Sequence, residues 1–273
     1  MENRRNKTEE NETIAEEPGL FSPERRQQIM RVLEREQRAT VAELSRLFSV
    51  SEVTIRKDLT WLETQGLALR THGGAIPNTS AVNEIGYAER EQLRRSEKQR
   101  IARAAASYVQ DGDTVVLDAS STTLAMVPYL GAKQELTIVT NGVRTGMELL
   151  QFPGISVLML GGMLRRESAS LVGNWGRALL EQVNISKAFV GARGLTLSAG
   201  LTDVNSEEVE IKRAIVGAAK EVIAVIDSSK WGLVTLATFC PLERLTRIIT
   251  DPLAPPTMIQ QARDLGIDVQ LVG

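Results

Sequence analysis

Residues 50–62 read Val-Ser-Glu-Val-Thr-Ile-Arg-Lys-Asp-Leu-Thr-Trp-Leu, and this stretch decides how the first part of the chain folds. Ile55, Leu59 and Leu62 recur at the spacing of one helix face, which predicts a helix with its apolar side packed inward. Ser51 stands where a helix N-cap belongs. The outer and flanking faces of this helix then carry Glu52, Val53, Thr54, Arg56 and Lys57.

Two shorter helical patterns precede this helix, and an alternating stretch follows it. The serine–proline pair at 22–23 begins the first helix, with a capping hydroxyl and a proline at the first helical position. Thr40, with Glu43 three residues on, matches the capping box and begins the second helix. Residues 67–76 alternate and turn on two glycines, as a small β-wing does. The order predicts a winged helix-turn-helix domain over residues 22–77.

A helix of this kind fits the major groove of DNA, where side chains read base edges. Thr54 can reach bases there and Lys57 can donate to guanine, whereas Ser51 and Arg56 can hold phosphates. The alternative is a charged helix face that is merely solvated, since residues 22–76 carry nine Lys and Arg against seven Asp and Glu. The order of helices, caps, turn and wing favours DNA binding. We expect contacts to the duplex from Ser51, Glu52, Thr54, Arg56, Lys57, Arg70 and His72.

The residues of this first part also carry a resemblance to a known family. Val50 to Leu59, followed by Leu62-Glu63 and by Arg70-Thr71-His72-Gly73-Gly74-Ala75, resemble the signature of the DeoR family of bacterial transcriptional regulators. In that family the segment is the DNA reader. The resemblance therefore implies that residues 51–57 bind double-stranded operator DNA.

Length and composition limit what the rest of the chain can be. With 273 residues, 42% of them hydrophobic, there is room for two globular domains, and a net charge of −2 argues neither for nor against nucleic acid. We expect a disordered acidic tail over residues 1–21, a linker over residues 78–95 and a second domain over residues 96–273. No apolar run is long enough to span a bilayer, and the N-terminus lacks a signal-peptide pattern. With Cys240 as the single cysteine, we expect a cytoplasmic protein that does not engage membranes.

Beyond the linker, short β-rich runs alternate with helical patterns. This alternation predicts an α/β domain with a mostly parallel sheet covered on both faces. The predicted strands are Thr114–Leu117, Leu136–Val139, Ile155–Leu160, Ala188–Val190, Glu221–Ile226, Thr246–Ile249 and Asp268–Leu271. The predicted helices are Thr122–Leu130, Val143–Leu150, Trp175–Val183, Ser206–Lys220 and Pro256–Leu265.

Candidate ligand-binding residues follow the predicted strands, because ligands of an open parallel sheet bind outside the carboxyl ends of its strands. After the first strand come Asp118, Ser120, Ser121, Thr122 and Thr123, which lead straight into a helix. Four hydroxyls at a helix N-terminus suit a phosphate. The alternative is an ordinary N-cap, for which one hydroxyl is enough.

Later strand ends add further candidates, namely Asn141, Gly161, Gly162, Gly191, Asp227 and Lys230. The glycines let a ligand approach the backbone closely, although turns use glycine as well. Asp227 and Lys230 can hold a sugar hydroxyl and a phosphate, or simply pair with each other. Glu208 and Lys212 stand four residues apart in one predicted helix, where such a pair is usually a surface salt link. We favour that interpretation for Glu208 and keep Lys212 as a ligand candidate.

The second domain also resembles the DeoR family, in its C-terminal sensor domain. That domain is similar in fold to ribose-5-phosphate isomerase, glucosamine-6-phosphate deaminase and coenzyme A transferases. In the family it binds phosphorylated sugars or related intermediates, which release the protein from its operator. Ser120 departs from the family, which commonly has glycine there, and this narrows the loop or adds a donor. The matching segments are Asp118-Ala119, Ser121-Thr122-Thr123, Val139-Thr140-Asn141, Leu160-Gly161-Gly162, Phe189-Val190-Gly191, Lys212-Arg213-Ala214, Asp227-Ser228-Ser229-Lys230 and Ile249-Thr250-Asp251.

Three functions stay open at this point. The leading hypothesis is a transcriptional regulator, in the form of a repressor of a carbohydrate-metabolism operon, that a small phosphorylated metabolite releases from DNA. The alternative is a sugar-phosphate isomerase or deaminase with a DNA-binding appendage, but residues 96–273 contain no histidine and offer no nucleophile–base pair or metal cluster. We therefore expect no catalytic residue, no metal and no cofactor. The third is a DNA-binding scaffold whose second domain only oligomerises.

Two further expectations concern assembly and signalling. Regulators of this kind read paired half-sites, so we expect a homo-oligomer, either a dimer or a tetramer. The basic stretch at residues 90–100 is either a solvated helix or a route by which a bound ligand affects the DNA reader.

Overall fold

The computed structural model describes all residues except 1–21, 37, 65–66 and 78–85. The chain divides into two compact units, Met1–Val82 and Asn83–Gly273. The acidic tail expected over residues 1–21 lies outside the described residues. Within the expected linker, residues 78–85 also lie outside them, whereas residues 87–92 form a helix of the second unit.

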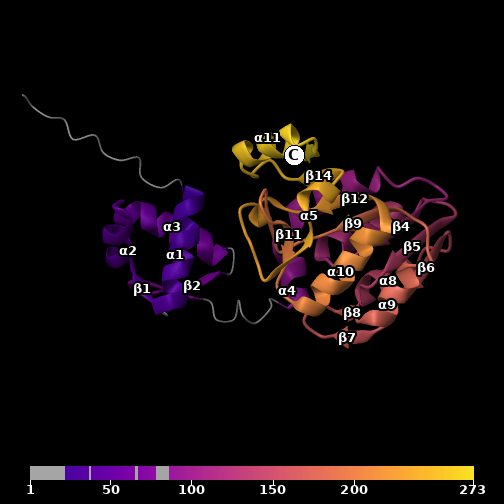
Figure 1. Ribbon diagram of the computed structural model, residues 1–273, viewed down its shortest axis with the longest axis horizontal. Helices are drawn as coiled ribbons and strands as arrows, with labels where there is room; N and C mark the ends of the chain where they lie inside the picture. Colours follow the sequence, from indigo (N-terminus) through magenta and orange to yellow (C-terminus); the bar gives the residue numbers. More distant parts are fainter. Residues whose placement is uncertain (1–21, 37, 65–66, 78–85) are drawn as a thin grey trace, which may run out of the picture. The chain divides into compact units, whose positions relative to one another are not determined.

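The first unit is a small helical domain with a three-stranded sheet in the order β1-β3-β2. Helix α2 begins with the predicted capping box, in which the Thr40 side chain accepts from the Glu43 amide. Ile29, Leu44 and Leu59 are fully buried in its core. The elements are α1 Ser22–Glu36, β1 Ala39–Thr40, α2 Val41–Phe48, α3 Glu52–Thr64, β2 Ala68–Thr71 and β3 Gly74–Pro77 (Figure 1). The three helices and the β2–β3 wing confirm the predicted helix-turn-helix architecture, and β1 adds a strand that was not predicted.

A buried carboxylate fixes helix α3 to helix α1. The Nε groups of Arg25 and Arg26 donate to the two Asp58 oxygens at 2.6 and 2.8 Å. The Asp58 side chain is only 2% exposed. The Arg26 guanidinium also lies 4.5 Å from the centre of the Trp61 ring. These contacts set the orientation of α3 from within the core, and they leave the opposite helix face open.

The second unit is built on a seven-stranded parallel sheet in the order β15-β14-β12-β9-β4-β5-β6. The predicted mostly parallel α/β fold is thereby confirmed. The strand order reverses between β4 and β9, which are direct neighbours. The strands of this sheet are β4 Thr114–Leu117, β5 Leu136–Thr140, β6 Ile155–Met159, β9 Ile185–Val190, β12 Ala219–Val225, β14 Arg247–Thr250 and β15 Asp268–Leu271.

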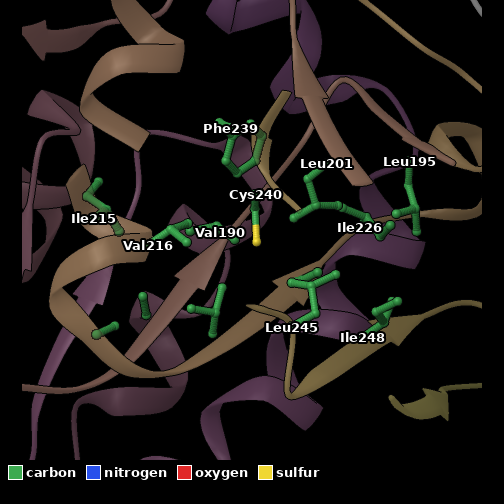
Figure 2. Close-up of a cluster of buried hydrophobic side chains, with 14 of the residues drawn as sticks. Val190, Leu195, Leu201, Ile215, Val216, Ile226, Phe239, Cys240, Leu245 and Ile248 are labelled. Carbon is green, nitrogen blue, oxygen red and sulfur yellow. The ribbon is translucent and has the colours of Figure 1, made fainter. Parts of the chain in front are cut away.

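Helices cover both faces of this sheet because successive strand residues point to opposite sides. Val115 and Leu117 pack with residues of α5, α7 and α8, whereas Val116 packs with residues of α9, α10 and α11. Figure 2 shows part of the buried cluster on the side of the sheet that Val116 faces, with the Cys240 sulfur among aliphatic side chains. The helices are α4 Tyr87–Gln92, α5 Arg95–Ala106, α6 Ser121–Leu124, α7 Val127–Leu130, α8 Val143–Leu149, α9 Asn174–Leu180, α10 Ser206–Ala218 and α11 Pro256–Asp264, with short 3-10 turns η2 Ser228–Lys230 and η3 Leu242–Arg244.

Two smaller sheets were not predicted. Strands β10 Gly194–Thr196, β11 Gly200–Asp203 and β13 Ala237–Cys240 form an antiparallel sheet, and β7 Met163–Arg165 pairs with β8 Ser170–Val172 in a hairpin. The single helix expected over residues 122–130 is two short helices, α6 and α7. Such short strands carry too few residues for a period-2 pattern to stand out.

Two properties bear on the expected environment of the chain. Burial raises the pKa of the Cys240 thiol to about 12, which keeps it neutral inside the core. Among the described residues, no helix has both the length and the apolar character needed to cross a membrane.

Removal of the buried carboxylate of α3 tests how the first unit is held together. We expect Asp58→Ala to lower the free energy of unfolding of this unit by about 3–5 kcal/mol, because Arg25 loses its ion pair inside the core. Hydrogen exchange of α1 and α3 amides in the full-length protein measures the change. Glu63→Ala, which removes an exposed carboxylate from the same helix, is the control. Equal exchange rates in both variants would contradict this role of Asp58.

Candidate functional site

The exposed face of α3 is the candidate DNA interface. Ile55 and Leu59 are fully buried, and Ser51, Glu52, Arg56 and Lys57 are exposed, as the helical pattern predicts. The Ser51 hydroxyl accepts from the Thr54 amide at 3.2 Å, so it caps the helix. Thr54 is half-buried, and its hydroxyl shares a hydrogen bond of 2.9 Å with that of Ser51. The start of α3 is therefore a rigid, polar surface.

Arg70 and Arg56 have contacts that the sequence did not reveal. From the wing, the Arg70 Nη1 donates to the Arg56 carbonyl and to the Thr60 hydroxyl, each at 3.4 Å. Arg56 pairs with Glu52 one turn away at 2.7 Å. Arg70 thus braces α3 against the wing, while Lys57 and His72 are exposed. Val53, which the expected DNA-contact set leaves out, is 64% exposed beside Thr54.

In the second unit, polar side chains meet where the strand order of the sheet reverses. Asp118 follows β4 and Gly191 follows β9, and the Gly191 amide donates to the Asp118 carboxylate at 3.0 Å. Asp118 is fully buried. Its other oxygen accepts from the Ser120 amide at 3.0 Å. Because ligands of open α/β sheets bind at such a reversal, the carboxyl edge of β4 and β9 is the candidate ligand site.

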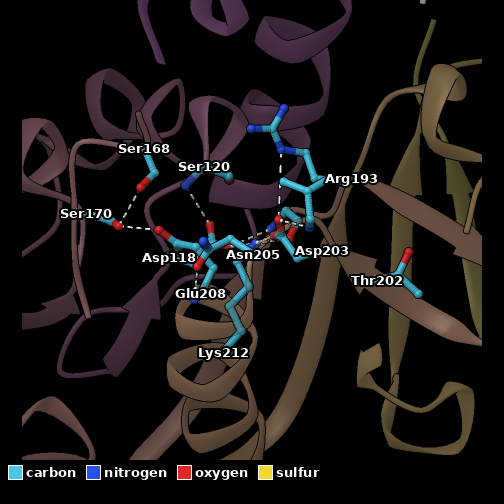
Figure 3. Close-up of polar contacts among 12 residues, drawn as sticks. Asp118, Ser120, Ser168, Ser170, Arg193, Thr202, Asp203, Asn205, Glu208 and Lys212 are labelled. Atoms are coloured by element: carbon cyan, nitrogen blue, oxygen red, sulfur yellow. Dashed lines mark hydrogen bonds and ion pairs between the residues drawn. The ribbon is translucent and has the colours of Figure 1, made fainter. Parts of the chain in front are cut away.

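Lys212 of α10 joins this edge to the small antiparallel sheet. Its ammonium lies 2.7 Å from Asp203 at the end of β11 and 3.2 Å from Asp118, and it donates to the Gly191 carbonyl at 2.8 Å (Figure 3). Burial works to lower the pKa of Lys212, but the carboxylates of Asp203, Asp118 and Glu208 outweigh it and raise that pKa. Burial likewise works to raise the pKa of Asp203, and Lys212 and Arg193 hold it below its usual value. Lys212 is therefore a permanent buried cation.

Glu208 corrects an expectation from the sequence. It is 3% exposed rather than part of a surface salt link, and its carboxylate accepts from the Ser170 hydroxyl and from Arg165 Nη1 at 3.1 Å. Both donors belong to the β7–β8 hairpin. The Asn205 side chain caps α10 by accepting from the Glu208 amide at 3.2 Å. A helix face cannot be assigned to solvent from an i, i+4 charge pair alone, because a neighbouring hairpin can cover it.

Lys212, Asp203 and Glu208 line a pocket that opens to solvent. Of the predicted ligand-binding residues, Ser120 and Lys212 line it, and Asp118 and Gly191 contact Lys212 directly behind it. The other lining residues were absent from the predicted set. They are Arg90, Ala119, Ser168, Ala192, Arg193, Asp203 and Glu208.

The hydroxyls between Ser120 and Thr123 are used largely within the loop. The Ser120 hydroxyl caps α6 by accepting from the Thr123 amide at 3.2 Å. The Thr123 hydroxyl lies at 2.7 Å from the Asp118 carbonyl and is fully buried. Ser121 donates to the Arg90 carbonyl at 3.5 Å, and Thr122 is 5% exposed. The capping interpretation therefore accounts for Ser120 and Thr123, and Ser120 is the residue of the four that also lines the pocket.

The remaining predicted residues lie outside the pocket lining. Asn141 is fully buried after β5 and donates to the Leu171 carbonyl, which ties it to the hairpin. A Cβ at Gly162 would lie 2.1 Å from the Val172 carbonyl oxygen, so a side chain does not fit there, whereas a Cβ at Gly161 would make an ordinary contact of 3.8 Å with Trp175. Asp227 caps η2 and pairs with Arg94, its Oδ1 lying 3.6 Å from the arginine Nε, rather than with the neighbouring Lys230 alone.

Arg90, Arg193 and Asp203 are three charged lining residues that the predicted set did not contain. Arg193 follows β9 by three positions and was available as a strand-end residue. Asp203 ends β11, a strand too short to predict. Arg90 lies in α4, within the stretch expected to be a linker. For Asp203 and Arg90 the missing information was the tertiary placement of a short element.

The contact between Ser120 and Gly191 predicts a paired dependence. A Cβ at Gly191 would lie 2.5 Å from the Ser120 Cβ, so we expect Gly191→Ala to lower the free energy of unfolding by about 1–3 kcal/mol. Chemical denaturation of the second unit measures this cost. In the Ser120→Gly background the same substitution should be nearly free. An equal cost in both backgrounds would contradict the contact.

Lys98 of α5 predicts a pH dependence of stability. Burial lowers its pKa to about 8, Asp227 opposes this shift, and Lys230, Arg90 and Arg193 reinforce it. Between about pH 8 and the ordinary lysine pKa near 10.4, the unfolded chain binds a proton at Lys98 that the folded protein does not. The unfavourable contribution of Lys98 to the free energy of folding therefore becomes smaller as the pH rises through this range.

We therefore expect Lys98→Met to be more stable than the parent at pH 7, with the difference shrinking as the pH approaches 10. All other groups titrate in both proteins, so denaturation curves of the pair isolate Lys98. A difference that stays constant with pH would contradict the lowered pKa.

Comparison with known proteins agrees with this two-unit arrangement. Residues 25–81 match the DeoR-like helix-turn-helix domain, and residues 93–252 match the DeoR C-terminal sensor domain. The second unit shows a partial likeness to ribose 5-phosphate isomerase A from Neisseria gonorrhoeae, with a TM-score of 0.37 and 16% identity over 49% of this chain and 52% of that chain.

Relatives match over nearly the whole chain. The HTH-type transcriptional regulator GolR of Listeria innocua is 35% identical over 92% of this chain and 99% of its own length. A putative aga operon transcriptional repressor of Escherichia coli O157:H7 is 33% identical over 92% and 94%, and the transcriptional repressor GlcR of Bacillus subtilis is 35% identical over 86% and 90%. Their names are those of regulators, which decides against the isomerase alternative. The chain belongs to the DeoR family and is a helix-turn-helix transcriptional regulator.

Proposed function

We propose that this regulator represses a carbohydrate-metabolism operon and that a phosphorylated sugar or related metabolite, bound in the pocket of the second unit, releases it from DNA. The observation that carries the proposal is that the pocket lining combines two arginines with two carboxylates. Arg90 and Arg193 supply cations for a phosphate, and Asp203 and Glu208 supply acceptors for hydroxyls. A sugar phosphate offers an anion to the arginines and hydroxyl groups to the carboxylates.

The names of two relatives support this proposal. One is named as a putative repressor of the aga operon and another as a transcriptional repressor. In this chain the reading face would be the start of α3, with Thr54 and Val53 at base edges and Lys57 on a base or phosphate. The protein would act in the cytoplasm as a homo-oligomer on paired half-sites.

The switch requires that the metabolite prefer one arrangement of the protein. A ligand that bound the DNA-bound and DNA-free forms equally would change nothing. The metabolite must therefore bind the DNA-free form more tightly, and by reciprocity DNA must weaken metabolite binding by the same factor.

Substitutions on α3 test the DNA half of the proposal. We expect Lys57→Ala to weaken binding to an operator selected from a random duplex library by about 10- to 100-fold, because one charged contact to a base or phosphate is lost. Thr54→Ala should relax base preference with a smaller loss of affinity. Fluorescence anisotropy and repeated selection measure both effects. Lys220→Ala, an exposed lysine of the second unit, is the matched control, and parent-like binding by both α3 variants would place the reader elsewhere.

A substitution in the pocket tests the sensor half. A panel of sugar phosphates should contain a compound that releases the parent protein from the selected operator and raises its melting temperature without being turned over. We expect Arg193→Gln to require at least about tenfold more of that compound, because the variant lacks a cation that lines the pocket, while its affinity for DNA stays the same. Turnover of the compound, or an unchanged response in the variant, would contradict the proposed sensor.

A further inference from the structure

Helix α4, the first helix of the second unit, forms part of the pocket wall. Arg90 lines the pocket together with Ser120 and Arg193. The Arg90 carbonyl accepts from the Lys98 ammonium and, at 3.5 Å, from the Ser121 hydroxyl. The helix is thus attached to the site by side chains of α5 and α6, although it was expected to be part of a linker.

The rest of α4 is held by a buried aromatic ring and by charged groups. The Tyr87 ring is buried, with the Arg90 and Arg144 guanidinium groups 5.1 and 5.4 Å from its centre. Arg144 also pairs with Glu91. The Tyr87 ring belongs to the buried cluster that contains residues of α5 and α7, so α4 is anchored to the second unit at Tyr87 and through the ion pair of Glu91.

The break between α4 and α5 is made by a residue in the left-handed region. Arg94 has φ 51° and ψ 42°, a conformation that disfavours side chains other than glycine, asparagine or aspartate. Its Nε lies 3.6 Å from the Asp227 carboxylate after β12. The chain thus turns sharply at Arg94, whose side chain lies beside Asp227, and α4 is set apart from α5 as a separate short element.

Cations gather around the pocket side of α4. The charges of Arg90 and Arg193 act on both Lys98 and Lys230, and Asp227 acts on both lysines with the opposite sign. Arg94 pairs with Glu97 and Asp227, and Arg193 lies 4.0 Å from Asp203. Arg90 and Arg193 both line the pocket, so an anion bound there gains two charged donors. Two of these cations, Arg90 and Arg94, belong to α4 and the turn that follows it.

We propose that Arg90 binds the anionic group of the effector, so that occupancy of the pocket is transmitted to the DNA-binding unit through the position of α4. This inference rests on the proposed function and names the residue and the element that couple its two halves. The second unit begins at Asn83 and α4 at Tyr87, so α4 is the first described element of the pocket that the chain reaches after the DNA reader. An anion held between Arg90 and Arg193 favours one position of α4, which is the differential interaction a switch needs.

Hydrogen exchange in the full-length protein tests the inference, with inorganic phosphate as the probe of the anionic group. We expect millimolar phosphate to slow exchange of the α4 amides by about tenfold relative to chloride at equal ionic strength. Arg90→Gln should abolish this slowing, and Arg90→Lys should retain part of it. Arg95→Gln removes an exposed arginine of α5 and is the matched control, so it should respond as the parent does.

The outcomes separate the inference from the proposed function. If phosphate raises the melting temperature of the parent but leaves α4 exchange unchanged, or if Arg90→Gln binds phosphate as the parent does, the coupling through α4 is wrong and the sensor pocket stands. If phosphate does not bind to the parent at all, both the anion site and the coupling are wrong. Loss of phosphate binding in Arg90→Gln, with retention in Arg95→Gln and an unchanged melting temperature without phosphate, supports the inference.

Discussion

The buried ammonium of Lys212 is the interaction on which the sensor site depends. It connects α10 to the ends of three strands, through Asp118 after β4, Gly191 after β9 and Asp203 on β11. An ammonium buried without such partners costs several kcal/mol, so the carboxylates and the lysine must be present together. Because their positions are fixed before any ligand arrives, little ordering remains to oppose binding.

Each unit contains a buried charged side chain that pairs with two groups of opposite charge. In the first unit, Arg25 and Arg26 donate to the buried Asp58 carboxylate, and these contacts hold α3 by its inner face. In the second unit, the buried Lys212 ammonium pairs with the carboxylates of Asp118 and Asp203, and these contacts hold part of the pocket lining in place. In both, a buried charge with paired partners specifies the orientation of an element whose other face is left for a ligand. The family assignment agrees with a reader and a sensor built as separate units.

The sequence predicted most of the architecture, but only part of the site. The capping box at Thr40 and the strands around 114–117 and 268–271 were predicted closely, because each depends on neighbours along the chain. The burial of Glu208 and the role of Arg90 could not be predicted in this way. Glu208 is buried because the β7–β8 hairpin packs beside it, and Arg90 lines the pocket because it belongs to α4, a short helix that was not predicted. Local patterns specify elements, whereas contacts between distant segments specify the pocket.

In the proposed switch, a metabolite in the pocket of the second unit and DNA on α3 of the first unit oppose each other. The dissociation constant of the releasing sugar phosphate, determined by calorimetry for the free protein and for the protein saturated with its selected operator, tests this opposition. We expect the operator to weaken metabolite binding by at least about fivefold, and by the same factor as the metabolite weakens operator binding. Equal dissociation constants with and without the operator would contradict it.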